Sequence, residues 1–415
     1  MTVTRALRDA GGSFDTVRSL LLADSFLPHK GGSRTYYYHL YKDWNPDQVT
    51  VLTKKVPGWQ EFDARESSKY FRIIRRFRPA PSFQYRELPR AALTSLHAIA
   101  RSQVEPVDVI HSGDLFPQGL VAILLKRLRG FPYIAFCHGE EISQTDRFHY
   151  QPAVRNRIYQ SADAVIANAE YACERLRKIG VPSERIHKIT PGVDCEVFSP
   201  GSPNPELRAF HRLSNHFVLL TVARLIPRKG HDMVLRAVAK LGADFPDLRY
   251  LIVGSGPEEA SLRKLAATLG IAQRVTFAGF VADKQLPDYY RLSNLLVMPN
   301  REQNNDLEGF GISFLEASAT AKPVIAGRSG GTSEAVKQGI SGELIDPKDL
   351  DQLVAAIRGF VVNTERAEFM GRLGRKRAAT EFDWKARARE LRNITRNIAA
   401  SRRSARTTNG RIPAA

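Results

Sequence analysis

The sequence predicts an α/β protein made of two doubly wound domains, each built on a parallel sheet. Its 415 residues are long for one hydrophobic core, which favours two domains of about 180–200 residues each. Short apolar runs rich in β-branched residues alternate with amphipathic helical patterns, as expected where parallel strands are buried on both faces. This alternation stops at residues 198–216, which are rich in Pro, Ser and Asn, and then restarts.

Twelve strands are predicted, six in each half of the chain. In the first half they cover residues 17–23, 50–52, 71–75, 107–111, 132–137 and 163–168. In the second half they cover residues 217–223, 249–254, 275–280, 295–299, 323–327 and 342–346. We therefore expect a first domain at 13–197, a linker at 198–215, a second domain at 216–378, a helix at 379–399 and a basic, disordered tail at 400–415.

Composition argues against several classes of protein. The three cysteines are too few, and lack the CxxC spacing, for a disulfide framework or a zinc site. No apolar run approaches the ~20 residues that span a bilayer, and the N-terminal residues lack the apolar core of a secretory signal. We therefore expect a cytoplasmic protein. The formal net charge of +18 indicates an anionic partner, such as nucleic acid, an anionic membrane face or a phosphate-bearing substrate.

Two features of the first domain follow predicted strands, at the sheet edge where ligands of open parallel sheets bind. Gly31 and Gly32 lie where a helix begins, so their backbone could approach a phosphate closely, although a tight turn explains them equally well. His138 follows the strand at 132–137. It could hydrogen-bond a substrate hydroxyl or act as a base, and a surface-loop histidine is the plainer alternative. With two such domains, the natural site is the cleft that they face.

Two loops of the second domain carry similar signals. Arg224 and Lys229 follow its first strand, and two cations at this edge suit a diphosphate better than they suit a solvated basic loop. Gly254 and Gly256 follow the next strand, but Glu259 occupies the third glycine position of a dinucleotide fingerprint. We therefore expect this loop to approach a base or a ribose rather than to bind NAD.

Residues 306–331 combine carboxylates and glycines around a helix that leads into a strand. Glu308 lies in the loop before the helix, and Glu316 lies one to two turns inside it. Unpaired amides at the helix start suit a phosphate and the carboxylates suit hydroxyls, which together indicate a nucleotide-sugar site. A buried helix with ordinary turn glycines is the alternative. Eight helical positions span about 12 Å, which disfavours a glycosidase-like carboxylate pair.

These motifs together resemble glycosyltransferase family 4, whose members have the GT-B architecture of two Rossmann-like domains facing a cleft. The resemblance rests on the segments EGFGISFLE (308–316), ARLIPRKGHD (223–232), LIVGSGPEEASL (251–262), ITPGVD (189–194) and PHKGG (28–32). It extends from about residue 17 to residue 395. The sequences of these motifs are similar to those of bacterial phosphatidylinositol mannoside mannosyltransferases and of exopolysaccharide glycosyltransferases. Two departures are Glu140, where close relatives often have His, and Pro191, where many members have Asn.

The resemblance implies retaining transfer of a hexose from a nucleoside diphosphate sugar, without a covalent enzyme nucleophile. It implies that His138, Arg224, Lys229 and Glu308 take part in catalysis. The implied donor contacts are Gly31, Gly32, Arg224, Lys229, Gly254, Glu308, Gly309, Phe310, Gly311, Ile312 and Glu316. Within this set the two cations hold the diphosphate, the first glutamate holds the sugar and the second glutamate holds the ribose. The helix at 379–399 would cross back to the first domain.

The nucleoside diphosphate sugar is expected to bind as the donor substrate, and no metal or other cofactor is expected. Asp349 and Asp351 form the one obvious D-x-D pair, but they begin an amphipathic helix, where capping explains them. The similarity of the motif sequences alone favours mannose as the sugar. Two other readings stay open: a nucleotide-sugar-binding protein without transferase activity, and a GT-B epimerase.

The acceptor is expected to be a glycan or a lipid-linked molecule bound by the first domain. Basic residues interleaved with aromatics at 69–90, and further basic residues at 124–131, suit an anionic membrane surface, although a solvated basic surface explains them too. No nucleic-acid-binding module is evident, so we expect no nucleic-acid partner. The protein would then be cytoplasmic and peripheral on the inner face of the plasma membrane.

Overall fold

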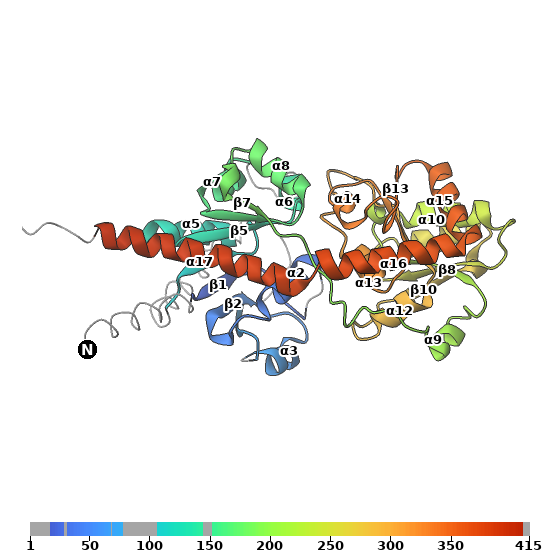
Figure 1. Ribbon diagram of the computed structural model, residues 1–415, viewed down its shortest axis with the longest axis horizontal. Helices are drawn as coiled ribbons and strands as arrows, with labels where there is room; N and C mark the ends of the chain where they lie inside the picture. The colour runs from blue at the N-terminus through green and yellow to red at the C-terminus, as the bar shows by residue number, and fades with distance from the viewer. Residues whose placement is uncertain (1–16, 29–30, 68, 78–105, 144–151, 410–415) are drawn as a thin grey trace, which may run out of the picture. The chain divides into compact units, whose positions relative to one another are not determined.

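The computed structural model describes residues 17–28, 31–67, 69–77, 106–143 and 152–409 (Figure 1). These residues form two compact units. The first unit contains the chain up to Ile189 together with the residues from Lys385 onward, and the second unit is Thr190–Trp384. Each unit has one parallel sheet with helices packed on it, which confirms the predicted α/β class.

The sheet of the first unit has seven parallel strands in the order β3-β2-β1-β4-β5-β6-β7. The chain builds outward from β1 in one direction and then, from β4, in the other. The carboxyl ends of these two central strands are where a doubly wound sheet binds its ligand. The strands are β1 Ser19–Leu22, β2 Val49–Lys54, β3 Arg72–Phe77, β4 Val109–Ser112, β5 Tyr133–Cys137, β6 Ala164–Ala167 and β7 Ile186–Lys188. The helices are α2 Gly32–Tyr41, α3 Trp59–Glu66, α5 Gln118–Arg129, α6 Glu140–Ser143, α7 Pro152–Ser161, α8 Glu170–Lys178 and α17 Trp384–Asn409, with 3-10 turns η1 Pro46–Gln48 and η2 Ser183–Arg185.

The sheet of the second unit has six parallel strands in the order β10-β9-β8-β11-β12-β13, again with a reversal beside its first strand. The strands are β8 Phe217–Val222, β9 Leu248–Val253, β10 Val275–Gly279, β11 Leu295–Met298, β12 Val324–Gly327 and β13 Gly342–Ile345. The helices are α9 Pro205–Phe210, α10 His231–Leu241, α11 Glu259–Thr268, α12 Leu286–Leu292, α13 Ile312–Ala319, α14 Thr332–Ala335, α15 Leu350–Val362 and α16 Thr364–Glu381, with 3-10 turns η3 Pro227–Lys229 and η4 Ala272–Arg274.

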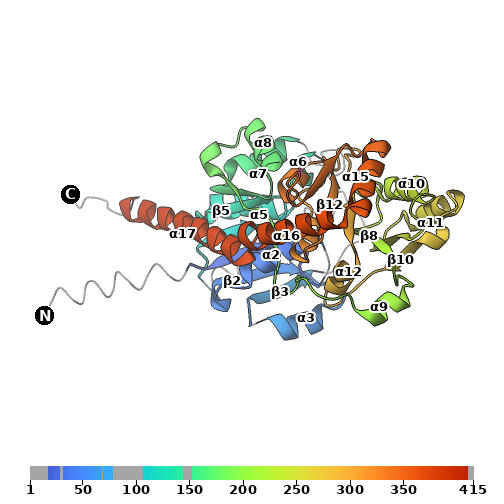
Figure 2. The same ribbon diagram turned by 45° about the vertical axis from the view of Figure 1, so that its right-hand side comes forward.

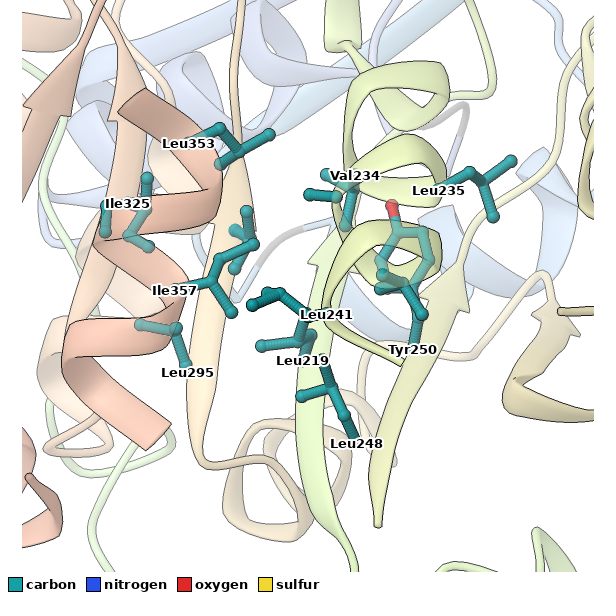
Figure 3. Close-up of a cluster of buried hydrophobic side chains, with 14 of the residues drawn as sticks. Leu219, Val234, Leu235, Leu241, Leu248, Tyr250, Leu295, Ile325, Leu353 and Ile357 are labelled. Carbon is teal, nitrogen blue, oxygen red and sulfur yellow. The ribbon is translucent and has the colours of Figure 1, made fainter. Parts of the chain in front are cut away.

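The core of the second unit explains why its strands are apolar along their whole length. Figure 3 shows α10 and α15 side by side over the sheet, with Leu241 and Ile357 directed toward Leu219 of β8. The next residue along β8, Leu220, points to the opposite face and is also fully buried. Both faces of the strand therefore exclude water, which selects a continuous apolar run rather than an alternating one.

The last strand of the first sheet and the boundary between the units differ from the prediction. The sequence pattern misses β7, a three-residue edge strand whose sequence, IHK, is neither apolar nor alternating. The boundary between the units falls after Ile189, before the predicted linker at 198–215. Within that segment α9 forms, because Asn204 caps it by accepting hydrogen bonds from the amides of Glu206 and Leu207. The helix packs against α12.

The C-terminal helix is longer than predicted, since residues 400–409 continue α17 instead of forming a disordered tail. The Arg402 guanidinium lies 4.4 Å from the centre of the Phe131 ring and donates to the carbonyl oxygens of Asp108 and Arg129. Arg403 also pairs with Asp108. These contacts hold α17 beside α5, as both views show (Figures 1 and 2). None of the helices formed by the described residues is long and apolar enough to cross a membrane.

Candidate functional site

Three loops of the second unit meet at the carboxyl edge of its sheet. They follow β8, β11 and β12, which are neighbours in that sheet. The loop after β8 lies against the loop after β11 at Gly230, where an added Cβ would come within 2.4 Å of the Pro299 carbonyl oxygen. The Gly230 φ of 74° also belongs to the left-handed region that favours glycine. This glycine therefore allows the two loops to make close backbone contact.

The start of α13 requires glycine for steric reasons. Gly311 has a φ of 94°, and a Cβ there would lie 2.4 Å from the Phe314 ring. The Phe310 side chain is buried against Phe382, so only its backbone can serve a ligand. Gly309 and Ile312 flank this turn. The first amides of a helix have no intrahelical partner, so the turn provides N–H groups that suit an anion.

Glu308 lies in this turn and is bound by three side chains. Lys229 Nζ lies 2.5 Å from its Oε2 atom, Arg228 Nη1 lies 2.8 Å from the same oxygen, and Asn300 Nδ2 also donates to it. Burial alone would raise the pKa of Glu308, but the attraction of Lys229 and Arg228 outweighs burial and lowers it. Glu308 is therefore a carboxylate at neutral pH.

The backbone of Glu308 is fixed by the glycine pair that follows β12. Gly331 N–H donates to the Glu308 carbonyl oxygen at 2.9 Å. A Cβ on Gly330 would lie 2.2 Å from that same oxygen, and the Gly330 φ is 57°. The two glycines at the end of the segment 306–331 thus hold the backbone of the first glutamate, a role that the sequence pattern does not predict.

The two predicted cations have different surroundings. Lys229 is mostly buried, and burial lowers its pKa while Glu308 partly offsets that effect. Arg224 is exposed, and its charge contributes to lowering the pKa of Lys229, so the two cations lie near each other. The sequence analysis did not include Arg228, although it precedes Lys229 directly, or Asn300. In their case the only sequence signal is position after a strand.

Glu316 lies on the second turn of α13, where Tyr290 O–H donates to its Oε2 atom at 2.6 Å. Burial raises the pKa of Glu316 to about 7, and the Tyr290 hydrogen bond opposes this only in part. Tyr290 is fully buried and belongs to α12. Glu316 is thus held in one orientation by a residue that the sequence pattern did not single out.

The loop after β9 contains Gly254 and Gly256 because it packs tightly on the loop after β8. A Cβ on Gly254 would lie 1.9 Å from the Ala223 carbonyl oxygen, and a Cβ on Gly256 would lie 2.4 Å from the Leu225 carbonyl oxygen. Backbone packing therefore explains both glycines, and the expected contact of Gly254 with a donor stays a prediction.

In the first unit, His138 follows β5 and contacts the buried Tyr37 of α2. The Tyr37 hydroxyl donates to the Gly113 carbonyl oxygen and lies 2.6 Å from His138 Nε2. Because the hydroxyl has one proton, Nε2–H must donate to it, which leaves Nδ1 as a hydrogen-bond acceptor. Burial, helped by the charge of Arg34, lowers the pKa of His138 to about 4, so the ring is neutral at pH 7.

The glycine pair at the start of α2 is less constrained. Gly32 is the first residue of α2, and a Cβ there would meet no atom within 4 Å. A Cβ on Gly31 would approach only the flexible side chain of Arg34. Packing within the described residues therefore gives no reason for two glycines, and their proximity to a ligand stays a prediction.

The acidic pair Asp349 and Asp351 has structural partners. Asp349 caps α15 by accepting from the Gln352 amide at 2.9 Å, and Asp351 pairs with Lys240 at 2.7 Å. In the part of the chain that the structure describes, no group of three or more His, Cys, Asp or Glu side chains could hold a metal ion.

The structure describes only part of the two basic segments, 69–90 and 124–131. Residues 78–90 of the segment 69–90 lie outside the described residues. Arg75 does not belong to a basic surface, because its side chain is buried, pairs with Asp63 and donates to the Lys54 carbonyl oxygen. In the segment 124–131, Lys126 pairs with Asp163, whereas Arg127 and Arg129 are exposed.

Comparison with known proteins places the chain in a family. Residues 30–197 match the family model described as Glycosyltransferase Family 4, and residues 204–377 match the model described as Glycosyl transferases group 1. A GDP-mannose-dependent alpha-(1-6)-phosphatidylinositol monomannoside mannosyltransferase from Mycolicibacterium smegmatis is 31% identical over 90% of this chain and 97% of the relative. A GDP-mannose-dependent monoacylated alpha-(1-6)-phosphatidylinositol monomannoside mannosyltransferase from Corynebacterium glutamicum is 27% identical over 91% of this chain and 97% of the relative.

Solved structures share the fold. Sucrose-phosphate synthase from Thermosynechococcus elongatus is 25% identical and aligns with a TM-score of 0.76 over 93% of this chain and all of that chain. Anabaena HepE, solved in complex with UDP and glucose, is 22% identical and aligns with a TM-score of 0.75 over 91% of this chain and 99% of that chain. With both units matched, the chain belongs to glycosyltransferase family 4, has the GT-B fold and is a glycosyltransferase.

Proposed function

We propose that this protein transfers a mannosyl residue from GDP-mannose, with retention of anomeric configuration, to a phosphatidylinositol mannoside or a related lipid-linked acceptor. The sugar, the nucleotide and the acceptor are suggested by the names of relatives that are 31% and 27% identical. The observation that carries the donor assignment is the Lys229–Glu308 pair at the start of α13. It combines a cation suited to a diphosphate with a carboxylate suited to sugar hydroxyls.

In the proposed reaction, the bond between the anomeric carbon and the diphosphate oxygen breaks, and a bond from that carbon to the acceptor oxygen forms. The acceptor oxygen attacks on the face from which the diphosphate leaves, so retention requires no enzyme nucleophile. The acceptor proton passes to the leaving diphosphate, so no separate enzyme base is required. Arg224 and Lys229 stabilise the negative charge that develops on the departing GDP. The amides of Gly309–Ile312 bind the donor beside Glu308, which accepts hydrogen bonds from the sugar. No metal ion takes part.

Further contacts complete the proposed donor site. Glu316 accepts hydrogen bonds from the ribose hydroxyls, and the loop at Gly254 approaches the nucleoside. His138, neutral at pH 7, binds a hydroxyl of the donor sugar. Gly31 and Gly32 lie near the diphosphate or the acceptor. Each of these roles depends on the resemblance of its motif to the family. For Gly31, Gly32, His138 and Gly254 it depends also on the position of the residue after a strand.

The membrane contact is proposed for the outer side of α5. Leu124 and Leu128, one turn apart, are 39% and 62% exposed, and Arg127 between them is exposed as well. Apolar side chains beside arginine suit the surface of an anionic bilayer, where a lipid-linked acceptor resides. The protein would then act as a peripheral protein on the inner face of the plasma membrane.

Thermal unfolding in the presence of nucleotides tests the donor assignment. The protein is heated with GDP, UDP, ADP or TDP, in parallel samples with and without a chelator. A ligand at 100 times its dissociation constant adds about 2.7 kcal/mol of stability, which raises the midpoint by several degrees, at roughly 2–4 °C per kcal/mol. The proposal predicts the largest shift with GDP. A larger shift with another nucleotide would reject GDP-mannose, and no shift with any of them would reject a nucleotide-sugar donor. A shift that the chelator abolishes would reject metal independence.

A further inference from the structure

We propose that Arg228 and Asn300 are positioning residues that anchor Glu308 through one carboxylate oxygen and so present the other oxygen to the donor sugar. This inference rests on the proposed function and deepens it. Neither residue is assigned to the reaction by the motif pattern that led to Glu308, Arg224 and Lys229.

The anchoring is one-sided. Arg228 Nη1, Lys229 Nζ and Asn300 Nδ2 all donate to Oε2 of Glu308. Among the described residues, no donor forms a hydrogen bond to Oε1. This oxygen is also not completely enclosed by the protein. A carboxylate has about four acceptor sites, two on each oxygen. The described part of the protein therefore supplies donors to one oxygen and none to the other, which leaves Oε1 for a ligand.

The two anchoring residues are themselves immobilised. Arg228 is 7% exposed and its Nε atom lies 3.1 Å from Asp306 Oδ1, while its carbonyl oxygen accepts from the Arg301 amide at 2.9 Å. Asn300 is fully buried and lies two residues after the end of β11. Donors held by their own packing fix the direction of the Glu308 carboxylate more strictly than a flexible ammonium can.

The charge balance separates Arg228 from the diphosphate-binding cations. Arg228 and Lys229 face two carboxylates, Asp306 and Glu308, so the buried cluster is neutral. Arg228 contacts both carboxylates, whereas Lys229 pairs with Glu308. When a diphosphate binds, Lys229 has three protons to share between it and Glu308. Arg228 and Asn300 then keep Glu308 in place whichever way Lys229 turns.

Donor affinity has two parts, the affinity for GDP and the additional affinity that the sugar contributes. Both parts can be measured. Calorimetry gives the dissociation constants of GDP and of GDP-mannose for the wild type and for Arg228→Gln and Asn300→Ala. The wild type is expected to gain affinity from the sugar. Each variant is expected to bind GDP within about 3-fold of the wild type and to lose most of that sugar-dependent gain, about 10-fold or more, because a hydrogen bond to a charged group is misdirected. The variants' kcat should fall ~100-fold, as for a reacting group displaced by about 1 Å.

A matched variant controls for a merely structural effect. Arg274→Gln removes a half-buried arginine that bonds the carbonyl oxygens of Gly242, Phe245 and Pro246, at the edge of the sheet opposite Glu308. It is expected to lower the unfolding midpoint without changing the ratio of the two dissociation constants. If Arg228→Gln and Asn300→Ala keep the wild-type ratio and kcat, or weaken GDP and GDP-mannose equally, the positioning role is wrong while the proposed function stands. If the wild type binds neither ligand, the proposed function fails and this inference fails with it.

Discussion

Lys229 and Glu308 are 79 positions apart in the sequence, yet their charged atoms lie 2.5 Å apart at the start of α13. The loop after β8 supplies the cation and the loop after β11 supplies the carboxylate. Both loops are brought together because their strands are neighbours in the sheet. A diphosphate and the sugar attached to it need this pairing of charges within a few ångströms.

Glu308→Gln should lower kcat/KM with GDP-mannose by at least ~10²-fold, because an amide replaces the acceptor oxygens that hold the sugar. The midpoint of unfolding should also fall, since Arg228 and Lys229 lose their counter-charge. Steady-state kinetics measure the first effect. Glu368→Gln, which breaks a surface pair with Arg372 on α16, is the control and should keep wild-type kinetics. Wild-type activity in Glu308→Gln would remove this residue from the site.

Lys229→Met should lower kcat by ~10²–10³-fold, because one charged donor to the leaving diphosphate is lost. The affinity for GDP should fall as well, which distinguishes this variant from those that affect only the sugar. Calorimetry with GDP measures that loss. Lys240→Met removes an exposed lysine that pairs with Asp351, and it should leave both quantities unchanged. Unchanged GDP affinity in Lys229→Met would place the diphosphate elsewhere.

Glu316 should make stability depend on pH. Burial raises its pKa from an ordinary 4.5 to about 7, so between these values the folded chain holds a proton that the unfolded chain has released. Stability from this group is therefore complete below about pH 4.5 and is lost as pH rises toward 7, by at most about 1.4 kcal/mol per pH unit. Denaturant unfolding of the wild type and of Glu316→Gln at pH 5 and pH 8 measures the difference.

The wild type should lose more stability than Glu316→Gln between pH 5 and pH 8, because glutamine does not titrate. Donor affinity should respond in the opposite direction, since the ionised form is the better acceptor for ribose hydroxyls. Equal pH dependence in the two proteins would show that Glu316 titrates near its ordinary range.

Gly311→Ala should destabilise the second unit in two ways. Alanine pays about 1–2 kcal/mol for the left-handed φ, and its Cβ would collide with the Phe314 ring, which costs about 1–3 kcal/mol more. Gly270→Ala is the matched control, because its φ is 69° but no atom lies within 4 Å of an added Cβ. Denaturant unfolding should show a larger loss for Gly311→Ala. Equal losses would mean that the turn can open to accept the side chain.

Replacing Leu124 and Leu128 together by Ser should reduce sedimentation with phosphatidylglycerol vesicles at low salt, since these side chains are the exposed apolar part of α5. Val362 and Phe369 are 70% and 57% exposed in the second unit, and serine at both of those positions should leave binding unchanged. The same loss in both double variants, or equal wild-type binding to phosphatidylcholine vesicles, would contradict a specific role for α5.

The strands of this protein can be predicted because burial on both faces leaves a plain apolar signal, as in β8 and β9. The three-residue β7 carries no such signal and was missed. The helical end of α17 was also missed, because its stability comes from contacts of Arg402 with Phe131 and Asp108 that only the folded chain brings together. Local composition reports solvent exposure, and in this helix long side chains cover apolar surface instead.

The residues of the candidate site also fall into a predicted group and a missed group. Motif spacing identified Glu308 and Lys229, which the structure brings together. It did not identify Arg228, Asn300 or Tyr290, since each acts by contacting a residue distant in sequence. It also treated Arg75 as part of a basic surface, although that side chain pairs with Asp63 in the interior. Positively charged residues look alike in sequence whether their partner is a ligand, a lipid or a buried carboxylate.

The most direct measurement is the mass and anomeric configuration of the lipid product formed from GDP-mannose and phosphatidylinositol monomannoside. The account predicts one added hexose in α linkage with the wild type, and at least ~10²-fold less of it with Glu308→Gln. A product formed only from a different nucleotide sugar would contradict the assignment of GDP-mannose, and a β-linked product would contradict retention. An equal yield from Glu308→Gln would contradict the site itself.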